Sequence, residues 1–192
     1  MVKIRWHIDK LVPLTYCFFK GVPFVIKHSQ TGLCFYPKDG IGLDNVEVVL
    51  ARKCDDRNSF FTWTKQRTLA SVALKGFCFH PFGGSPNPHY GTKLVIYKLC
   101  RGRQLKFIYN AITMGLKQKT SGKFLKPATK NVVEGTGVVF GDANVKPWMR
   151  FKLVGKLMKI SFVTKENSMQ DCSIHHINGW RLTISRLPGE MT

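Results

Sequence analysis

Two sequence markers recur three times along this chain at nearly constant intervals. The segments Phe61-Thr62-Trp63, Leu105-Lys106-Phe107 and Met149-Arg150-Phe151 each run apolar, polar, aromatic, and their first residues stand 44 residues apart. A segment running from glycine to proline precedes each, at 32–37, 76–81 and 122–127, in steps of 44 and 46 residues. Self-similarity at this period indicates a supersecondary unit that needs its copies to bury an apolar face. We therefore expect a threefold repeat over residues 22–154, with a leader at 1–21 and an extension at 155–192.

Short β-strands are predicted within each repeat. Runs rich in β-branched and aromatic residues, separated by Gly, Pro, Asn and Asp, occur at 24–26, 46–50, 93–97 and 138–140. No segment in the repeats keeps an apolar period of 3.6 residues, so long helices are not expected. Units of this length also suit propeller blades, but a propeller needs about four to eight blades to close. Three units favour a β-trefoil, an all-β barrel in which the three triplets are equivalent core strands.

The two ends of the chain carry weaker signals. Residues 174–184 hold an Asn-Gly turn with alternating apolar residues beyond it, which predicts a β-hairpin that either caps the barrel or borders a further module. Near the start, residues 11–19 resemble the apolar part of a signal peptide but are interrupted by Pro13. We interpret the leader as a weak secretion signal or as a fragment of a longer N-terminus. No run of 18 apolar residues is present to span a membrane.

Cysteine placement predicts disulfide bonds inside the first two repeats. Both repeats have a cysteine pair at matching positions, and the third repeat lacks both members. Joint presence and joint absence is typical of a bonded pair, and each bond would contribute roughly 3 kcal/mol on the chain-entropy estimate. Such bonds favour an oxidising, secreted setting, whereas buried reduced thiols are the alternative. The predicted pairs are Cys34–Cys54, Cys78–Cys100 and, by elimination, Cys17–Cys172.

The net charge of +19 is extreme for a chain of 192 residues. No Asp or Glu occurs between Arg57 and Val133, a stretch that contains fourteen Lys and Arg residues. Such a field attracts polyanions, among them nucleic acid, anionic headgroups and sulfated glycans. The alternative is a soluble surface that is basic without a dedicated partner, because the cations are scattered through strands.

The second repeat resembles the mytilectins, β-trefoil lectins that bind galactose in one shallow site per repeat. The resemblance rests on 80–88 (HPFGGSPNP) and 91–96 (GTKLVI), with weaker matches at 26–32 and 117–123. It implies that the histidine and glycine backbone of this motif contact the sugar, and that a downstream His and Asp complete the site. Tyr97-Lys98-Leu99-Cys100-Arg101-Gly102 stands at that downstream position. The paired cysteines resemble those of ricin-B-type trefoil lectins.

This resemblance assigns the candidate sugar ligands. A carboxylate acceptor makes a charge-assisted hydrogen bond to a hydroxyl, and glycine allows close approach of backbone N–H groups. In the third repeat Lys126-Pro127-Ala128 replaces the motif, so no sugar site is expected there. A plain hydrogen-bonded turn histidine is the alternative for His80. The candidates are His80, Gly83, Gly84 and Asn87 in the second repeat and Asp55 and Asp56 in the first.

Catalytic and metal signatures are missing from the sequence. No metalloprotease, nucleophile-elbow or Walker motif occurs. Cys172, His175 and His176 hint at metal but lack a fourth ligand. We therefore expect no enzyme activity and no cofactor.

The function predicted from the sequence is a secreted, galactose-binding lectin, with glycans or glycoproteins as partners and an oligomer as an option for avidity. One alternative is polyanion binding by a basic trefoil whose sugar pockets have decayed. Another is a structural or targeting module of a longer protein.

Overall fold

The computed structural model describes residues 21–155 and, further along, the strand backbones at 160–163, 169–176 and 180–184. Contacts divide the chain into two units, Met1–Gly155 and Lys156–Thr192, which are taken separately. No helix among the described residues is long and apolar enough to cross a membrane. The first unit holds the strands β1 (Phe24–His28), β2 (Cys34–Pro37), β3 (Val46–Ala51), β4 (Phe60–Trp63), β5 (Leu69–Ser71), β6 (Cys78–Pro81), β7 (Leu94–Tyr97), β8 (Phe107–Asn110), β9 (Gly115–Gln118), β10 (Leu125–Pro127), β11 (Val138–Phe140) and β12 (Phe151–Gly155).

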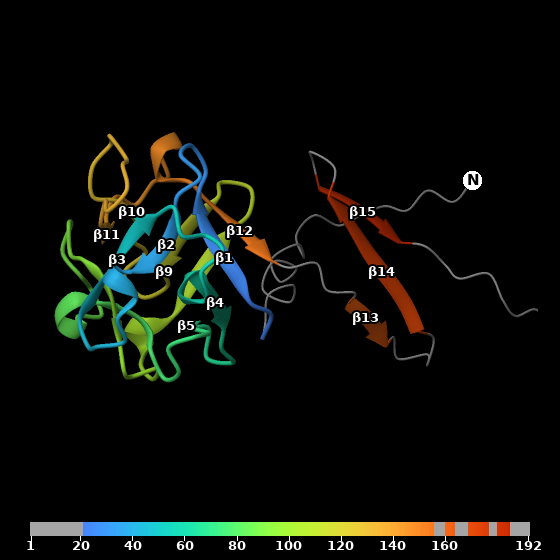
Figure 1. Cartoon of the computed structure of the whole chain (residues 1–192), viewed down its shortest axis with the longest axis horizontal. Coiled ribbons are helices and arrows are strands. Elements are labelled where there is room, and N and C mark those ends of the chain that lie inside the picture. The colour runs from blue at the N-terminus through green and yellow to red at the C-terminus, as the bar shows by residue number, and fades with distance from the viewer. Residues whose placement is uncertain (1–20, 156–159, 164–168, 177–179, 185–192) are drawn as a thin grey trace, which may run out of the picture. The chain divides into compact units, whose positions relative to one another are not determined.

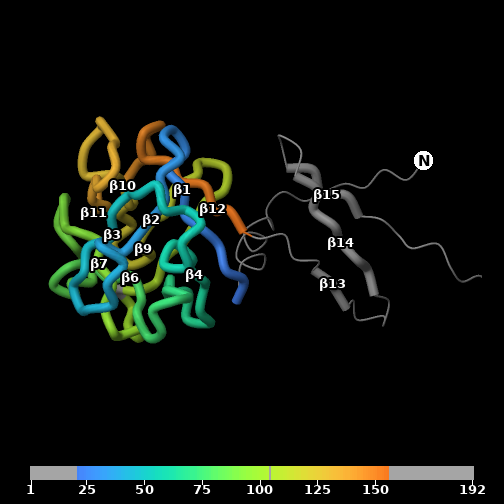
Figure 2. The backbone as a smooth tube through the Cα atoms, viewed as in Figure 1, coloured from blue at the N-terminus to red at the C-terminus, as the bar shows by residue number. Residues whose placement is uncertain are grey.

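The strands of the first unit form a barrel-like sheet. Antiparallel pairing runs in the order β12-β1-β2-β3-β7-β6-β5-β4, and β4 also pairs with β1, so seven of these strands close on themselves. Strand β12 lies along the whole of β1 (Figure 1), with Phe24 opposite Gly155 and His28 opposite Phe151. The two-stranded pairs β8–β9 and β10–β11 complete the unit, and Figure 2 traces the chain through them.

The strands follow one another in three sets of four, and each set repeats the same local event. A 3-10 turn precedes the fourth strand of every set: η3 (Arg57–Ser59), η5 (Arg103–Leu105) and η6 (Pro147–Met149). Two residues after each turn stand the buried rings of Phe61, Phe107 and Phe151. Each ring is paired with a buried polar residue on the first strand of the next set: Ser71, Gln118 and, across the closure, His28.

Aromatic residues fill the interior. Phe35 contacts Phe151 edge to face at 4.8 Å between centroids, and Phe61 lies 4.6 Å from Phe79. Edge-to-face and tilted pairs of this kind add about 0.5–1.5 kcal/mol beyond their buried area. The large side chains with no more than 1% exposure include Phe24, Phe35, Phe61, Phe79, Phe107, Phe140 and Phe151.

The structure corrects the alignment of the triplets. Phe61 lies on β4, whereas Leu105 and Met149 are the last residues of η5 and η6. In the first set the position of Leu105 and Met149 belongs to Ser59, which is also fully buried. The prediction was two residues out of register in the first repeat, because a buried serine carries no apolar signal.

The structure confirms the predictions of strands, buried aromatic residues and two disulfide bonds in this unit. The four predicted strand segments coincide with β1, β3, β7 and β11. Trp63 is buried, as are the later aromatic residues of the triplets. Disulfide bonds join Cys34 to Cys54 and Cys78 to Cys100, as predicted. Cys17 and the Cys172 side chain lie outside the described residues, as does the leader up to residue 20.

The second unit contains a three-stranded antiparallel sheet, in the order β13 (Ile160–Val163), β14 (Met169–His176) and β15 (Trp180–Ile184). Strands β14 and β15 pair from Cys172 opposite Ile184 to His176 opposite Trp180. The predicted hairpin is therefore present. Its turn and the side chains of Cys172, His175 and His176 lie outside the described part.

Candidate functional site

The motif of the second repeat folds as the end of β6 followed by a tight glycine turn. His80 is the third residue of β6, and the turn η4 (Phe82–Gly84) follows Pro81. Gly83 and Gly84 have φ of 76° and 72°. Two consecutive residues in the left-handed region favour glycine, because a Cβ costs roughly 1–2 kcal/mol there. The turn leads the backbone back past the imidazole, since a Cβ on Gly84 would lie 3.4 Å from His80 Cε1.

The His80 ring is buried, and among the described residues only one of its two nitrogens has a hydrogen-bond partner. Nδ1 lies 3.0 Å from the Pro81 carbonyl oxygen. Because a carbonyl only accepts, this contact assigns the proton to Nδ1 in the neutral ring and leaves Nε2 as an acceptor. Nε2 is buried without a hydrogen-bond partner in the described part of the chain. An unpaired buried acceptor costs about 1–3 kcal/mol, so a hydroxyl donor that reached this atom would be favourable.

Tyr97 occupies the place where the resemblance implied a downstream histidine. It ends β7, and its ring centroid lies 5.3 Å from that of His80. Its side chain is half-buried. Sequence reasoning noted Tyr97 only as a departure from the motif, whereas the structure places it beside the candidate histidine.

Asn87 is held by a neighbouring repeat. Its Oδ1 accepts from Lys123 Nζ at 2.7 Å, and that ammonium also lies 5.4 Å from the Tyr90 ring centroid. Within the described residues no hydrogen bond joins Asn87 to His80. Asn87 therefore ties the motif loop to the turn before β10.

Asp55 and Asp56 belong to a different part of the surface. They lie in the turn after Cys54, in the first set of strands. The Asp56 carboxylate accepts from the Asn58 backbone N–H at 2.8 Å and so caps η3. Asp55 is exposed. Among the described residues, no hydrogen bond or ion pair joins either aspartate to the His80 motif.

The first set has the same turn with its space filled. Asp39 and Gly40 have φ of 59° and 70°, matching Gly83 and Gly84. Tyr36 stands at the place of His80, and a Cβ on Gly40 would lie 2.6 Å from its hydroxyl oxygen. The Tyr36 side chain is buried, so it occupies the volume beside this turn.

The third set is filled by a lysine. The Lys126 stem packs so closely on Gly141 that a Cβ there would overlap it. Its Nζ lies 5.3 Å from the Trp148 ring centroid, a cation–π contact. The absence of a sugar motif in this repeat therefore coincides with a side chain that covers the equivalent position.

An acid does approach the second-repeat segment, from a distant part of the sequence. Asp44 Oδ1 accepts from the Lys98 backbone N–H at 2.7 Å. It arrives on the β3 side of β7, where Asn45 N–H also bonds the Ile96 carbonyl. His80 is on β6, the other neighbour of β7. Sequence spacing could not find Asp44, because 54 residues separate it from Lys98.

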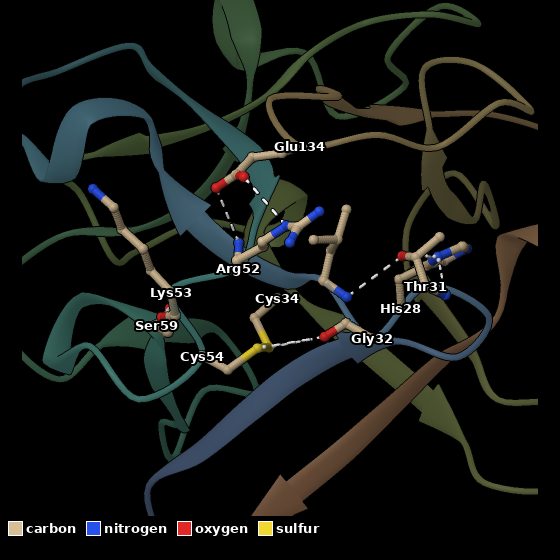
Figure 3. Close-up of a disulfide and its surroundings, with 10 residues drawn as sticks. His28, Thr31, Gly32, Cys34, Arg52, Lys53, Cys54, Ser59 and Glu134 are labelled. Carbon is tan, nitrogen blue, oxygen red and sulfur yellow. Dashed lines mark hydrogen bonds and ion pairs between the residues drawn. A yellow bond between two sulfur atoms is a disulfide. The ribbon is translucent and has the colours of Figure 1, made fainter.

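A separate groove lies between the first and third sets, near the first disulfide, whose surroundings are drawn in Figure 3. Arg52 and Glu134 join its two sides through an ion pair of 3.6 Å. The Cys54 sulfur lies 3.4 Å from the Gly32 carbonyl oxygen in the same view. The groove is lined by Thr31, Gly32, Leu33, Arg52, Val132, Val133 and Glu134. Among the described residues no group of three His, Cys, Asp or Glu could hold a metal ion.

Solved structures with a similar architecture include a designed threefold protein and two lectins. The designed protein, ThreeFoil, has a TM-score of 0.62 at 13% identity, covering 69% of this chain and 97% of its own. The C-terminal half of the earthworm R-type lectin, in complex with GalNAc, has a TM-score of 0.56 at 12% identity, covering 70% and 99%. A ricin B-like lectin from Macrolepiota procera, in complex with lactose, has a TM-score of 0.56 at 14% identity, covering 70% and 96%. The first unit therefore has the all-β fold of R-type and ricin-B-like lectins.

The chain belongs to the MytiLec family of alpha-D-galactose-binding lectins, whose model matches residues 24–156. No curated protein sequence matches it. The match covers all three sets of strands, including the two whose motif positions are filled by Tyr36 and Lys126.

Proposed function

We propose that this lectin binds galactose-containing glycans through one site, built by His80 and the Gly83–Gly84 turn. The observation that carries the proposal is the buried Nε2 of His80, which has no hydrogen-bond partner among the described residues and lies beside a turn where a Cβ on Gly83 would meet nothing within 4 Å. Galactose hydroxyls supply the donor that this nitrogen lacks. The backbone N–H groups of the glycine turn supply donors to a sugar oxygen.

Access to the site involves Tyr97. Because Nε2 is covered, a hydroxyl reaches it only after a neighbouring side chain turns aside, and the half-buried Tyr97 ring lies against the imidazole. Rotamer changes of a half-exposed side chain take picoseconds to nanoseconds. A single shallow site of this kind binds with about 4 kcal/mol, in the millimolar range.

The three sets of strands also support a β-trefoil. In this proposal a pseudo-threefold axis relates the buried rings of Phe61, Phe107 and Phe151, each paired to the next set. The two disulfides support passage through an oxidising compartment and hence secretion. The proposal includes no catalytic step.

The test is titration calorimetry of the full chain with methyl α-D-galactoside, beside a glycan array. His80→Ala is expected to remove at least about nine-tenths of the affinity, because an acceptor in a desolvated site is lost. His89→Ala is the matched control, since His89 is an exposed histidine of the same loop. Unchanged galactoside binding by a folded His80→Ala variant, or no galactoside binding by the wild type, would contradict the proposal.

A further inference from the structure

We propose that the second-repeat site prefers galactosides carrying a sulfate or carboxylate group, which Arg101 and Arg103 bind. The inference rests on the proposed function and names the class of sugar within it. Both kinds of ligand carry a fixed negative charge close to the galactose ring. The charge is either a sulfate on the ring itself or the carboxylate of the sugar residue bonded to it.

Chain geometry brings the segment of the two arginines to β6, the strand that carries His80. The Cys78–Cys100 disulfide fastens the segment that begins at Cys100 to β6, two residues before His80. Arg103 opens η5, and η5 contacts β6. Both arginine side chains are exposed. The segment after the disulfide therefore borders the site with two cations.

The corresponding segment of the first set has the opposite charge. Asp55 directly follows Cys54, as Arg101 directly follows Cys100. The loops are otherwise built alike: the sulfur of Cys54 lies 3.4 Å from the Gly32 carbonyl oxygen, and that of Cys100 lies 3.3 Å from Gly76. Arg101 thus replaces an acid within a shared framework, whereas Arg103 opens η5 as Arg57 opens η3.

Within the described part of the chain, no ion pair involves Arg101 or Arg103. The ion pairs of the described residues join other groups, namely Arg52–Glu134, Lys93–Glu47 and Lys146–Asp142. The acid that approaches this segment, Asp44, is bound to the Lys98 backbone N–H on the far side of β7. Sequence around the site offers no other acid, because none occurs from Arg57 to Val133.

The chemistry of guanidinium fits such a ligand. Arginine binds sulfate or carboxylate through paired N–H donors, and these charge-assisted bonds are about twice as strong as neutral ones. A neutral galactoside can accept single hydrogen bonds from the arginines but offers no anion for the paired ionic contact. The buried Nε2 of His80 makes this a site for a defined sugar, in contrast to a diffuse basic surface that attracts any polyanion.

The experiment compares matched ligands by calorimetry on the full chain. Methyl β-D-galactoside is measured against its 3-O-sulfate, and lactose against 3′-sialyllactose, so that the two pairs separate sulfate from carboxylate. At least one anionic ligand is expected to bind about threefold to tenfold tighter than its neutral partner at low salt. Arg101→Gln and Arg103→Gln together are expected to remove that ratio. Arg57→Gln, which changes the residue that opens η3 in the first set, is the matched control and keeps it.

The outcomes separate the two proposals. Neutral galactoside binding that needs His80, with no gain from either anion, overturns the charge preference and leaves the galactose site intact. A gain that survives both arginine changes, or falls equally with Arg57→Gln, also overturns it and assigns the effect to the general basic charge. Absence of binding by all four ligands overturns the charge preference, and absence of methyl α-D-galactoside binding as well overturns the proposed function itself.

Discussion

His80 and Tyr97 lie on neighbouring strands with their ring centroids 5.3 Å apart and their planes inclined by 45°. One ring nitrogen of His80 is bonded to the Pro81 carbonyl, and the other is covered and unpaired. The central residue of the family motif therefore has one buried nitrogen with no hydrogen-bond partner among the described residues and an aromatic ring as its neighbour.

Truncation of the Tyr97 side chain is expected to strengthen sugar binding. If the Tyr97 ring must turn aside, Tyr97→Ala removes that cost and lowers the Kd for methyl galactoside by about twofold to fivefold. Tyr97→Phe keeps the ring and should stay near the wild type. Weaker binding by both variants in calorimetry would show that the phenol hydroxyl contacts the sugar.

The two glycines of the turn provide a matched pair. Alanine at either position suffers the same left-handed strain, of roughly 1–2 kcal/mol. Only at Gly84 does the added methyl meet the His80 ring, at 3.4 Å, whereas at Gly83 nothing lies within 4 Å. Gly84→Ala is therefore expected to weaken galactoside binding about tenfold more than Gly83→Ala, as one extra methyl does in a fitted pocket. Thermal melts of both variants, with equal shifts, would establish that stability is not the cause.

The first repeat can be converted into a working site. Tyr36→His with Asp39→Gly restores the His-Pro-x-Gly-Gly pattern on a turn that already has the required backbone, with φ of 59° and 70° at residues 39 and 40. Asp39→Gly alone should stabilise the fold by about 1 kcal/mol, since it relieves a left-handed aspartate. The double variant is expected to bind a second galactoside, counted by native mass spectrometry. Unchanged stoichiometry in a folded protein would show that the turn and histidine are insufficient.

The two disulfides should differ in their effect on binding. Replacing either pair by alanines is expected to cost roughly 3 kcal/mol, because each bond closes a loop of about twenty residues. Loss of Cys78–Cys100 also frees the segment beside His80, so it should weaken sugar binding, whereas loss of Cys34–Cys54 should not. Chemical denaturation gives the stability, and calorimetry on the folded fraction gives the affinity.

Alkaline pH should weaken a contact between β8 and β12. The Tyr109 hydroxyl donates to the Phe151 carbonyl at 2.9 Å. Burial raises the pKa of this phenol from 10.0 to about 12, and a hydrogen bond with the Leu153 backbone opposes the rise in part. A raised folded pKa stabilises the fold fully below pH 10 and loses that contribution as pH climbs toward 12. The stability advantage of wild type over Tyr109→Phe should therefore shrink above pH 10, while Tyr90→Phe, changed at an exposed ring, follows the wild type.

The features that repeat along the sequence could be predicted from it, whereas contacts between residues far apart in the sequence could not. The β-branched composition of segments such as 46–50 predicts strands. The cysteine pairing was predicted because both members of a pair occur in the first two repeats and both are missing from the third. The predicted alignment of the triplets failed in the first repeat, where Ser59 is the counterpart of Leu105 and Met149. The burial of a serine depends on tertiary packing, which the sequence does not show. Asp44 at Lys98 and Tyr97 at His80 depend on strand order, which spacing alone does not give.

Tyr36 and Lys126 occupy the positions that correspond to His80 in the first and third sets, which leaves one candidate pocket for binding to cells. A chain with one working pocket can coat a galactose-bearing surface, but it cannot by itself hold two cells together. Agglutination would require two copies to associate, and dilution that separates them would leave coating intact while clumping disappears.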